Sequence, residues 1–381
     1  MKKQLDIGVT KWRFIVVMMV MAMFFCSCRH SGKHEIHDAD NEVEIASGLN
    51  IIHYRNFTLV EIKNPWREGA MLQTYALVPR DSLLPDDIPD DAIVVRTPVK
   101  SALVYSSVHG GVIKELGEVQ SITGVCDLEY FNMPEVITGV KEGRIVDAGK
   151  SVSPTVEKIM SFMPEVIILS PFQNGGYGIL ANLGIPIIEC ADYMENTPVG
   201  RAEWIKLFGE LYDKRAEADS IFNSVKDKYD SLRSVALRTK ERPKVISETV
   251  MSGVWYVPGG SSYMAHFYVD AGAEYPWADN NSAGSLSLDF AQVYDKAGDA
   301  DFWLIRSTTQ MTRESFVKSN PLNGKFKACK DGNVYQCCTL ETTLFQDFPF
   351  HPEILLEEYI KIFHPGMLPG DLKYFAPLSD E

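Results

Sequence analysis

The sequence predicts an α/β protein of two Rossmann-like lobes, each with a parallel-rich sheet, joined by one long rigid helix with a ligand cleft between the lobes. Two observations carry this prediction. Short apolar strands alternate with short helices in both halves of the chain, which is typical of parallel sheets covered on both faces. One helical pattern without proline, at 199–237, separates the two halves.

The same local pattern occurs once in each half. Ser153–Met160 leads through a turn into the apolar run 166–169, and Ser287–Tyr294 leads through a turn into 302–305. Each pattern predicts a short helix with an acidic residue near its start, followed by a buried strand. Two halves built alike indicate a duplication, and therefore a clamp with a cleft rather than an enzyme with one core.

Residues 1–28 have the composition of an export signal. A basic start is followed by the apolar stretch 14–25 and then by Cys26, Ser27 and Cys28. A membrane-spanning helix needs about 20 apolar residues, so this stretch is short for one. Because Ser27 directly before Cys28 resembles a degenerate lipobox, we predict Cys28 as the lipidated first residue of the mature chain. A plain secreted protein and an N-terminal membrane anchor are the alternatives.

Residues 29–48 are polar and lack periodicity, so they predict a flexible tether between membrane and globule. They include His34 and His37, for which a solvated histidine pair is the simpler interpretation and a metal site the alternative. After the tether we expect an N-terminal α/β lobe at 49–196, a connecting long helix at 197–240 and a C-terminal α/β lobe at 241–381.

The elements of both lobes follow from periodicity and from the positions of glycine and proline. In the N-terminal lobe, β-rich composition predicts a hairpin from 57–62 and 71–78 and a short strand at 92–95. Alternating helices and strands are then expected at 104–116, 119–125, 134–140, 154–162, 166–169, 177–183 and 185–189. The C-terminal lobe is expected to contain elements at 244–250, 261–271, 290–296, 302–305, 312–318, 334–337 and 353–363.

The composition is that of an ordinary soluble protein with a net charge of −14. This charge argues against nucleic-acid binding and against electrostatic binding to a membrane surface, since both need a basic face. Outside the signal, the cysteines are Cys126, Cys190, Cys329, Cys337 and Cys338, with no spacing typical of a zinc module. Single buried thiols, or one bridge from Cys329 to Cys337 or Cys338, both fit this pattern.

Polar and aromatic residues follow several of the predicted strands. The chain has no GxSxG, HExxH or Walker spacing that would indicate catalysis or nucleotide binding. Ligands of open parallel sheets bind beyond the carboxyl ends of the strands, so we expect a cleft there that suits a bulky, partly flat ligand with polar edges. The predicted ligand-binding residues are Tyr105, Ser107, His109, Phe172, Gln173, Tyr193, Trp255, Tyr256, Tyr263, Trp277 and Arg306. Ordinary packing explains any single one of them equally well.

Several segments in order resemble the substrate-binding lipoproteins of ABC importers for iron-siderophore complexes, haem and cobalamin. The segments are Arg144–Gly149, Ser153–Ile159, Pro164–Ile168, Leu183–Ile187 and Thr197–Ile205, within a similarity over 94–363. The resemblance implies two lobes joined by one long helix, little hinge motion, and a ligand held between the lobes and delivered to a membrane permease. It implies no catalysis and no cofactor, and as ligand an Fe(III)-siderophore, haem or cobalamin.

The resemblance also implies partners and a location. In this family an acidic residue on top of each lobe docks arginines of the two permease subunits. Glu157 matches the first position, and Asp289 stands where the second lobe should offer a glutamate. For both residues, an acid interacting with the helix dipole is the alternative. We expect a monomer in the periplasm, anchored to a membrane through lipid on Cys28, with no nucleic-acid partner.

Two other functions remain open. A free metal-ion binder of related shape needs three or four His, Asp or Glu side chains in the cleft, and the candidates are His109, His266 and Asp192. A periplasmic enzyme would use His109 or His266, but the sequence shows no activating partner for either. The identity of a chelate also stays open, because the aromatic residues fit haem, a corrin or a catecholate.

Overall fold

The computed structural model describes residues 41–173 and 175–380. The export signal, Cys28 and the predicted tether up to residue 40, with His34 and His37, lie outside the described residues. Among the helices that the structure describes, none combines the length and the apolar composition needed to cross a membrane.

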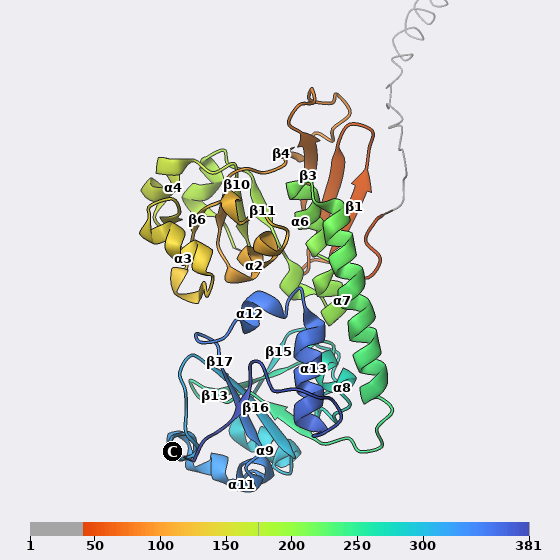
Figure 1. The fold of residues 1–381 in the computed structure, drawn as a ribbon, viewed down its shortest axis with the longest axis vertical. Coiled ribbons are helices and arrows are strands. Elements are labelled where there is room, and N and C mark those ends of the chain that lie inside the picture. The colour runs from red at the N-terminus through yellow and green to blue at the C-terminus, as the bar shows by residue number, and fades with distance from the viewer. Residues whose placement is uncertain (1–40, 174, 381) are drawn as a thin grey trace, which may run out of the picture. The chain divides into compact units, whose positions relative to one another are not determined.

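The described chain opens with a four-stranded sheet of order β1-β2-β3-β4, which lies beside the later helices α6 and α7 (Figure 1). Its strands are β1 (Leu49–His53), β2 (Thr58–Lys63), β3 (Met71–Pro79) and β4 (Ile93–Thr97). The predicted hairpin is present as antiparallel β2 and β3, and β4 adds in parallel to β3.

The end of the expected tether, residues 41–48, belongs to the folded unit. Val43 and Ala46 are buried in its core. The carboxylate of Glu203 accepts hydrogen bonds from the backbone N–H groups of Glu44, Ile45 and Ala46. The segment lacks periodicity because its backbone donors are satisfied by a side chain far along the sequence and not by a helix or strand of its own.

The N-terminal lobe contains a five-stranded parallel sheet of order β11-β10-β5-β6-β7. Its strands are β5 (Ala102–Val104), β6 (Ile122–Val125), β7 (Val146–Asp147), β10 (Val166–Leu169) and β11 (Ile187–Glu189), and its helices are α2 (Ser107–Glu115), α3 (Pro134–Lys141) and α4 (Val156–Phe162). A short antiparallel pair, β8 (Gly149–Lys150) and β9 (Ser153–Pro154), precedes α4. Every residue of β5 and β10 is buried, as expected for the centre of a parallel sheet with both faces covered.

Two elements of this lobe differ from the prediction. The helix expected at 104–116 begins only at Ser107, because Ala102–Val104 forms the central strand β5. The helix expected at 177–183 is a short 3-10 helix, Gly178–Asn182. The first difference concerns a short apolar run, for which strand and helix cannot be separated by periodicity. The second concerns only the type and length of the helix.

The C-terminal lobe is built on a second parallel-rich sheet, of order β12-β16-β17-β18. Its strands are β12 (Val245–Ser247), β16 (Phe302–Ser307) and β17 (Val334–Cys338), which are parallel, and the antiparallel edge strand β18 (Ala376–Pro377). Its helices are α8 (Tyr263–Asp270), α9 (Phe290–Ala297), α10 (Arg313–Ser319), α11 (Lys327–Asp331), α12 (Leu344–Asp347) and α13 (Pro352–Phe363). Two α/β lobes with parallel-rich sheets therefore confirm the predicted fold class.

A small antiparallel sheet in this lobe was not predicted. It consists of β13 (Val250–Met251), β14 (Val254–Pro258) and β15 (Ser285–Leu288). The chain leaves β12 through Glu248, whose φ is 64°, and joins β13 to β14 through Ser252 and Gly253, both with positive φ. Left-handed residues at both positions of a two-residue turn are typical of tight hairpins. The strand expected at 244–250 is therefore interrupted at Glu248.

Three helices, rather than one, occupy the connecting segment 197–240. They are α5 (Pro198–Ala202), α6 (Ile205–Tyr212) and α7 (Arg215–Ala236). The chain turns after α6 through Asp213, which has a left-handed φ of 57°. Helix α7 then packs closely on α6, since a Cβ on Gly209 would lie only 2.7 Å from the Cβ of Ala218. The apolar periodicity continues across this turn because both helices bury a face, and it therefore hides the break.

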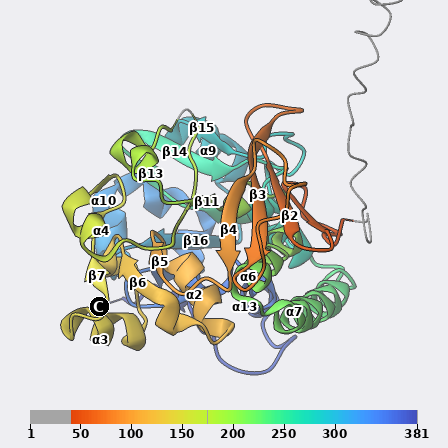
Figure 2. The ribbon, with the colours of Figure 1, turned by 90° about the horizontal axis from the view of Figure 1, so that it is seen from above.

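The 22-residue helix α7 runs along both lobes (Figure 1), and the view from above shows it beside α6 and α13 (Figure 2). Near its start, the Arg215 guanidinium donates to the Glu42 carboxylate over 2.8 Å. Near its end, Arg233 and the Tyr229 hydroxyl donate to the two oxygens of Asp270 on α8, over 2.7 and 2.8 Å. Helix α7 is thus fastened at one end to the segment that precedes β1 and at the other to the C-terminal lobe.

The lobes also meet directly where α2 packs on α12. A Cβ on Gly111 would lie 2.6 Å from the carbonyl oxygen of Gln346, so only glycine permits this approach. The Asn132 amide donates to the carbonyl oxygens of Leu340 and Thr342, over 3.1 and 2.9 Å. These backbone contacts hold one lobe against the other without a charged group.

An ion pair closes the same junction. His351 of the C-terminal lobe lies between Glu115 of α2, 2.7 Å from Nε2, and Glu353, 3.1 Å from Nδ1. Burial lowers the pKa of this imidazole, but the two carboxylates outweigh burial and raise the pKa to about 10. The group therefore carries a positive charge at neutral pH and bridges the lobes as an imidazolium.

Candidate ligand-binding site

A cavity of about 780 Å³ lies at the carboxyl ends of the strands in the N-terminal lobe. Tyr105 follows β5, Asp127 follows β6, and Ser170 follows β10. The cavity therefore lies where ligands of open parallel sheets usually bind, beyond the carboxyl ends of the strands. The C-terminal lobe closes the cavity with residues after β17 and on α12. The lining residues are Tyr105, Ser106, Ser107, Val108, Asp127, Tyr130, Ser151, Val152, Ser153, Pro154, Val156, Leu169, Ser170, Phe172, Gly175, Gly176, Tyr177, Gly178, Ile179, Leu180, Thr339, Thr342, Phe345 and Gln346.

Three of the predicted ligand-binding residues line this cavity together: Tyr105, Ser107 and Phe172. The Tyr105 hydroxyl is buried and has no hydrogen-bond partner among the residues that the structure describes. Burial, and then Cys126 and Asp127, raise the pKa of this phenol, so it stays protonated. Phe172 is 71% exposed, although large apolar side chains are usually buried. An unpaired buried hydroxyl and an exposed aromatic ring are both groups that a ligand can satisfy.

Hydroxyl groups and apolar side chains dominate the wall. The hydroxyls come from serine, threonine and tyrosine on both lobes, and each can donate and accept a hydrogen bond. Among the described residues that line the cavity, Asp127 is the one with a charged side chain, and lysine, arginine and histidine do not occur. Asp127 has a left-handed φ of 49°, and its carboxylate accepts a hydrogen bond from the Ser151 N–H.

The other predicted residues of the N-terminal lobe do not line the cavity. His109 is fully buried, and its Nε2 lies 3.1 Å from the Asp192 carboxylate. Arg201 donates to the second oxygen of that carboxylate over 3.0 Å. Burial opposes ionisation of Asp192, but Arg201 and His109 outweigh it and lower the pKa of the carboxyl. Tyr193 donates to the Pro171 carbonyl over 2.5 Å, and Gln173 is exposed beside the cavity wall.

The predicted aromatic residues of the C-terminal lobe belong mainly to its core. Trp255 is fully buried, stacks on Trp303 with 5.4 Å between ring centroids, and donates to the carbonyl oxygen of Ser247. Trp277 is also buried, whereas Tyr256 is half exposed on β14. These positions correct the expectation that all three face the ligand. The unpredicted strand β14 lies over the end of β12 and brings its tryptophan inward.

Two further residues of the C-terminal lobe serve as internal contacts. The Arg306 guanidinium donates to the Glu248 carboxylate through Nε over 2.7 Å and through a second nitrogen. It therefore already has the anionic partner that we expected from a ligand. Tyr263 lies under the guanidinium of Arg201, whose central carbon is 4.9 Å from the ring centroid. This cation–π contact joins α5 to α8 and extends the buried network of Asp192 towards the C-terminal lobe.

Sequence reasoning missed several lining residues for two different reasons. Asp127 lies two residues after β6 and Thr339 directly follows β17, so the rule that ligands bind at strand ends would have found both had it been applied to every strand. Phe345 and Gln346 lie on α12, a four-residue helix in a stretch that was not predicted to be regular. No local signal places such a helix against the opposite lobe.

The family known as periplasmic binding proteins matches residues 104–338 of this sequence, which is more than half of the chain. The chain belongs to this family. Membership of this family supports a solute-binding role for the chain. The match begins at the end of β5 and finishes at the end of β17, and it therefore contains the strand ends around the cavity.

Two curated relatives of this periplasmic binding protein are uncharacterized lipoproteins of Methanocaldococcus jannaschii. One is 29% identical over 317 residues, covering 77% of this chain and 75% of the relative. The other is 25% identical over 362 residues, covering 89% of each.

Solved structures share the fold at low sequence identity. An Fe3+-hydroxamate transport protein of Saccharomonospora viridis matches with a TM-score of 0.56 and 15% identity, covering 70% of this chain and 94% of that one. A periplasmic haem-binding protein of Pseudomonas aeruginosa matches with a TM-score of 0.58 and 14% identity, covering 74% and 98%. Helicobacter pylori CeuE with Ni(II) bound matches with a TM-score of 0.56 and 15% identity, covering 72% and 86%.

The two predicted docking carboxylates of this periplasmic binding protein lie on separate helices. Glu157 is exposed in the first turn of α4. Asp289 is exposed at the N-cap of α9, where its carboxylate accepts a hydrogen bond from the Gln292 N–H and its own backbone N–H donates to the Gln292 side-chain oxygen. Asp289 therefore has a structural task that Glu157 lacks, because a capping box stabilises the start of α9.

The three residues suggested for a free metal ion do not come together. His109 and Asp192 are paired in the core, but His266 lies on α8 and its Nδ1 contacts the Ser262 carbonyl. Among the described residues, one group of potential ligands is close enough for a metal, and it consists of Glu42, His53 and Glu210. None of these three lines the cavity.

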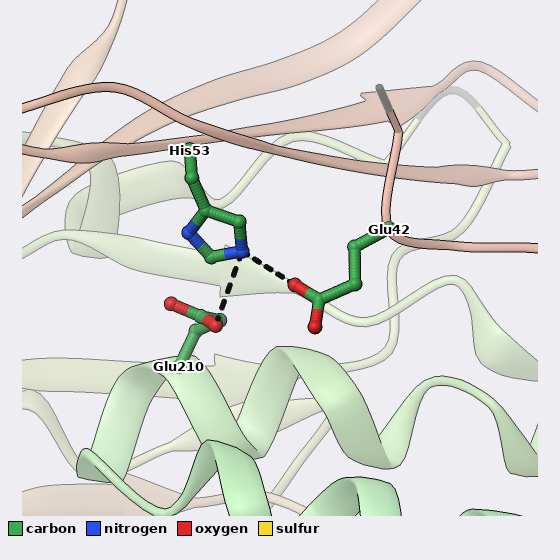
Figure 3. Close-up of side chains that lie close together, drawn as sticks. All are labelled: Glu42, His53 and Glu210. Carbon is green, nitrogen blue, oxygen red and sulfur yellow. Dashed lines mark hydrogen bonds and ion pairs between the residues drawn. The ribbon is translucent and has the colours of Figure 1, made fainter. Parts of the chain in front are cut away.

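Figure 3 shows the ring of His53 directed between the carboxylates of Glu42 and Glu210. Its Nε2 forms an ion pair with Glu42 and lies 3.7 Å from Glu210. Arg215 approaches both carboxylates, at 2.8 and 3.8 Å. Burial raises the pKa of Glu42, but His53 and Arg215 outweigh burial and lower it. With a guanidinium already among the carboxylates, we interpret the group as an ion-pair network that fastens residue 42 to β1, α6 and α7.

The five described cysteines are free and buried. Of the two alternatives that the sequence left open, the structure therefore has single buried thiols rather than a bridge from Cys329 to Cys337 or Cys338.

Proposed function

We propose that this protein is the substrate-binding component of an ABC importer, which captures an iron chelate, either a siderophore complex or haem, or cobalamin, and delivers it to a membrane permease. The observation that carries the proposal is the cavity at the strand ends of one lobe, closed by residues of the other. Its size is in the range of small-molecule sites, about 300–1,000 Å³.

The chemistry of the wall supports a chelated rather than a free metal ion. A free transition metal needs several His, Asp, Glu or Cys ligands directed at one point. Of the described lining residues, Asp127 alone has such a side chain. A chelate brings its own ligands and needs only hydroxyl and apolar contacts. The proteins of similar fold named above, which are described with Fe3+-hydroxamate, haem and Ni(II), support the same class of solute.

Two proposals concern location and delivery. We infer an extracytoplasmic protein held at a membrane by lipid on Cys28, supported by the family and by relatives that are named lipoproteins. We also infer that Glu157 and Asp289 dock onto the two permease subunits, because both carboxylates are exposed on helices of different lobes. Replacing Cys28 by Ser should move the protein from the membrane fraction to the soluble fraction, and an unchanged distribution would contradict the anchor.

The proposed function is tested by what the full-length protein carries when it is purified from its host membranes. We expect mass spectrometry and visible absorbance to show a metal chelate or corrinoid bound in about equal amount to the protein. Calorimetric titration with ferric siderophores, haemin and cyanocobalamin then measures affinity. A protein that carries no such compound and binds none of them would overturn the proposal.

A further inference from the structure

We propose that the cavity selects an uncharged or cationic chelate and discriminates against an anionic one. This inference rests on the proposed function and names the class of solute for the same cavity. It separates neutral hydroxamate-type complexes and corrinoids from catecholate complexes and from haem with its two carboxylates.

The first step is the charge of the wall itself. An anion removed from water needs a positive partner or a dense set of donors, because burying an unpaired charge is costly. The described residues around the cavity include no lysine, arginine or histidine, and they include Asp127. An anionic chelate would therefore lose its hydration without gaining an ion pair, and it would face a carboxylate.

The second step concerns the cationic groups near the cavity, which already have partners. Lys150, next to the lining residue Ser151, forms an ion pair with Glu129. Lys158 on α4 donates to the Asp147 carbonyl over 2.7 Å. In the C-terminal lobe, the partly exposed Arg306 is held by Glu248.

Arg201 is likewise held by Asp192 and stays in the core. A ligand that required any of these cations would have to break an existing contact.

One feature of the wall favours negative charge, but it is weak. Helix α2 begins at the cavity with Ser107 and Val108, and a helix N-terminus carries a partial positive charge. The side chain of Ser106 caps this end by accepting the hydrogen bond of the Val108 N–H. A partial charge that is already capped offsets little of the repulsion from the full charge on Asp127.

The remaining groups match a neutral ligand edged with oxygen atoms. The protonated phenol of Tyr105, which has no partner among the described residues, can donate to a carbonyl or hydroxamate oxygen. Tyr177 lines the same wall, and its hydroxyl is held by Glu189, a further acid behind the surface. Apolar side chains such as Phe172 and Phe345, one from each lobe, contact the carbon skeleton of the solute.

The test compares ligands that share a scaffold and differ only in charge. The full-length protein is titrated with ferrioxamine B, which has a free ammonium group, with its N-acetyl derivative, which is neutral, and with its N-succinyl derivative, which is anionic. Cyanocobalamin and its monocarboxylic acid form a second matched set, and ferric enterobactin and haemin complete the panel. Within a scaffold that binds, we expect the anionic form to bind at least about tenfold more weakly than the neutral form.

Each outcome decides one of the two claims. Equal or tighter binding of the anionic form, or binding of ferric enterobactin or haemin alone, would overturn the selectivity and leave the proposed function standing. Binding of none of the panel would overturn the proposed function itself. Tight binding that is restricted to neutral and cationic forms supports both.

Two variants locate the effect in the wall. Asp127→Asn keeps the left-handed backbone, which asparagine tolerates, and it should reduce the preference for cationic over neutral ferrioxamine by about threefold to tenfold. Gln346→Lys should improve binding of the anionic forms by about tenfold. The control is Asp295→Asn, an exposed acid on α9 away from the cavity, which should change neither. An unchanged charge preference in both wall variants would contradict the assignment to this cavity.

Discussion

Both lobes contain a parallel-rich sheet, but they contribute strand ends to the cavity unequally. In the N-terminal lobe, residues after β5, β6 and β10 form most of the cavity wall. In the C-terminal lobe, β14 lies over the end of β12, where Trp255 donates to the carbonyl of Ser247. Its wall comes instead from Thr339 and Thr342 after β17 and from α12. A strand end predicts a ligand site only where no other element covers it.

The largest expected difference between the lobes concerns stability. Trp255→Ala should lower the free energy of unfolding by about 4 kcal/mol, because it removes a fully buried aromatic side chain. The adjacent Tyr256→Ala is the matched control, since Tyr256 lies on the same strand, is 41% exposed, and should cost less than about 1 kcal/mol. Urea unfolding followed by circular dichroism measures both. If Trp255→Ala kept its stability and lost ligand binding, the tryptophan would belong to the site after all.

The next effect concerns affinity rather than stability. Phe172→Ala should weaken binding of the solute about tenfold and change the free energy of unfolding by less than about 0.5 kcal/mol. The reason is that 71% of Phe172 is exposed where it lines the cavity, so we expect a bound solute to cover a ring that the protein leaves open. Phe345→Ala provides the comparison from the opposite lobe in the same calorimetric titration. Unchanged affinity in Phe172→Ala would place the ligand elsewhere.

The fold could be predicted from the sequence more fully than the site. Alternating strands and helices are local patterns, and they located β10, β16 and α13 closely. The site depends on which strand ends are covered, and this is decided by tertiary contacts such as Trp255 on Ser247. The turn at Asp213 could not be predicted for a related reason: α6 before it and α7 after it both bury an apolar face, so the apolar periodicity of the sequence continues across the turn. Prediction failed where packing between distant segments decides the outcome.

A smaller effect should appear in the pH dependence of the junction between the lobes. The pKa of His351 is raised from 6.5 to about 10, so its contribution to stability is complete below pH 6.5 and is lost as the pH rises towards 10. The melting temperature of wild type should therefore exceed that of His351→Gln by a constant amount in acid and converge with it near pH 10. His364 is the contrasting control, because burial lowers its pKa and reverses the sign. A difference that grows with pH would rule out the charged bridge.

The smallest expected effects concern the two docking carboxylates. Glu157→Gln and Asp289→Asn should each slow ligand delivery to the permease by about threefold in reconstituted vesicles, without a change in solute affinity. Asparagine can still cap α9, whereas Asp289→Ala should also cost about 1 kcal/mol of stability. Delivery at the wild-type rate in the double variant would remove both residues from the docking surface.

The attachment of α7 to both lobes has a consequence for how the loaded protein is told apart from the empty one. With Arg215 fixed to Glu42 at one end and Arg233 fixed to Asp270 at the other, we expect the two lobes to move little relative to each other when a solute binds. The shape of the protein would then differ little between the empty and the loaded form. In the proposed delivery, we therefore expect the permease to recognise the loaded protein by the exposed face of the bound solute together with the rims of the two lobes.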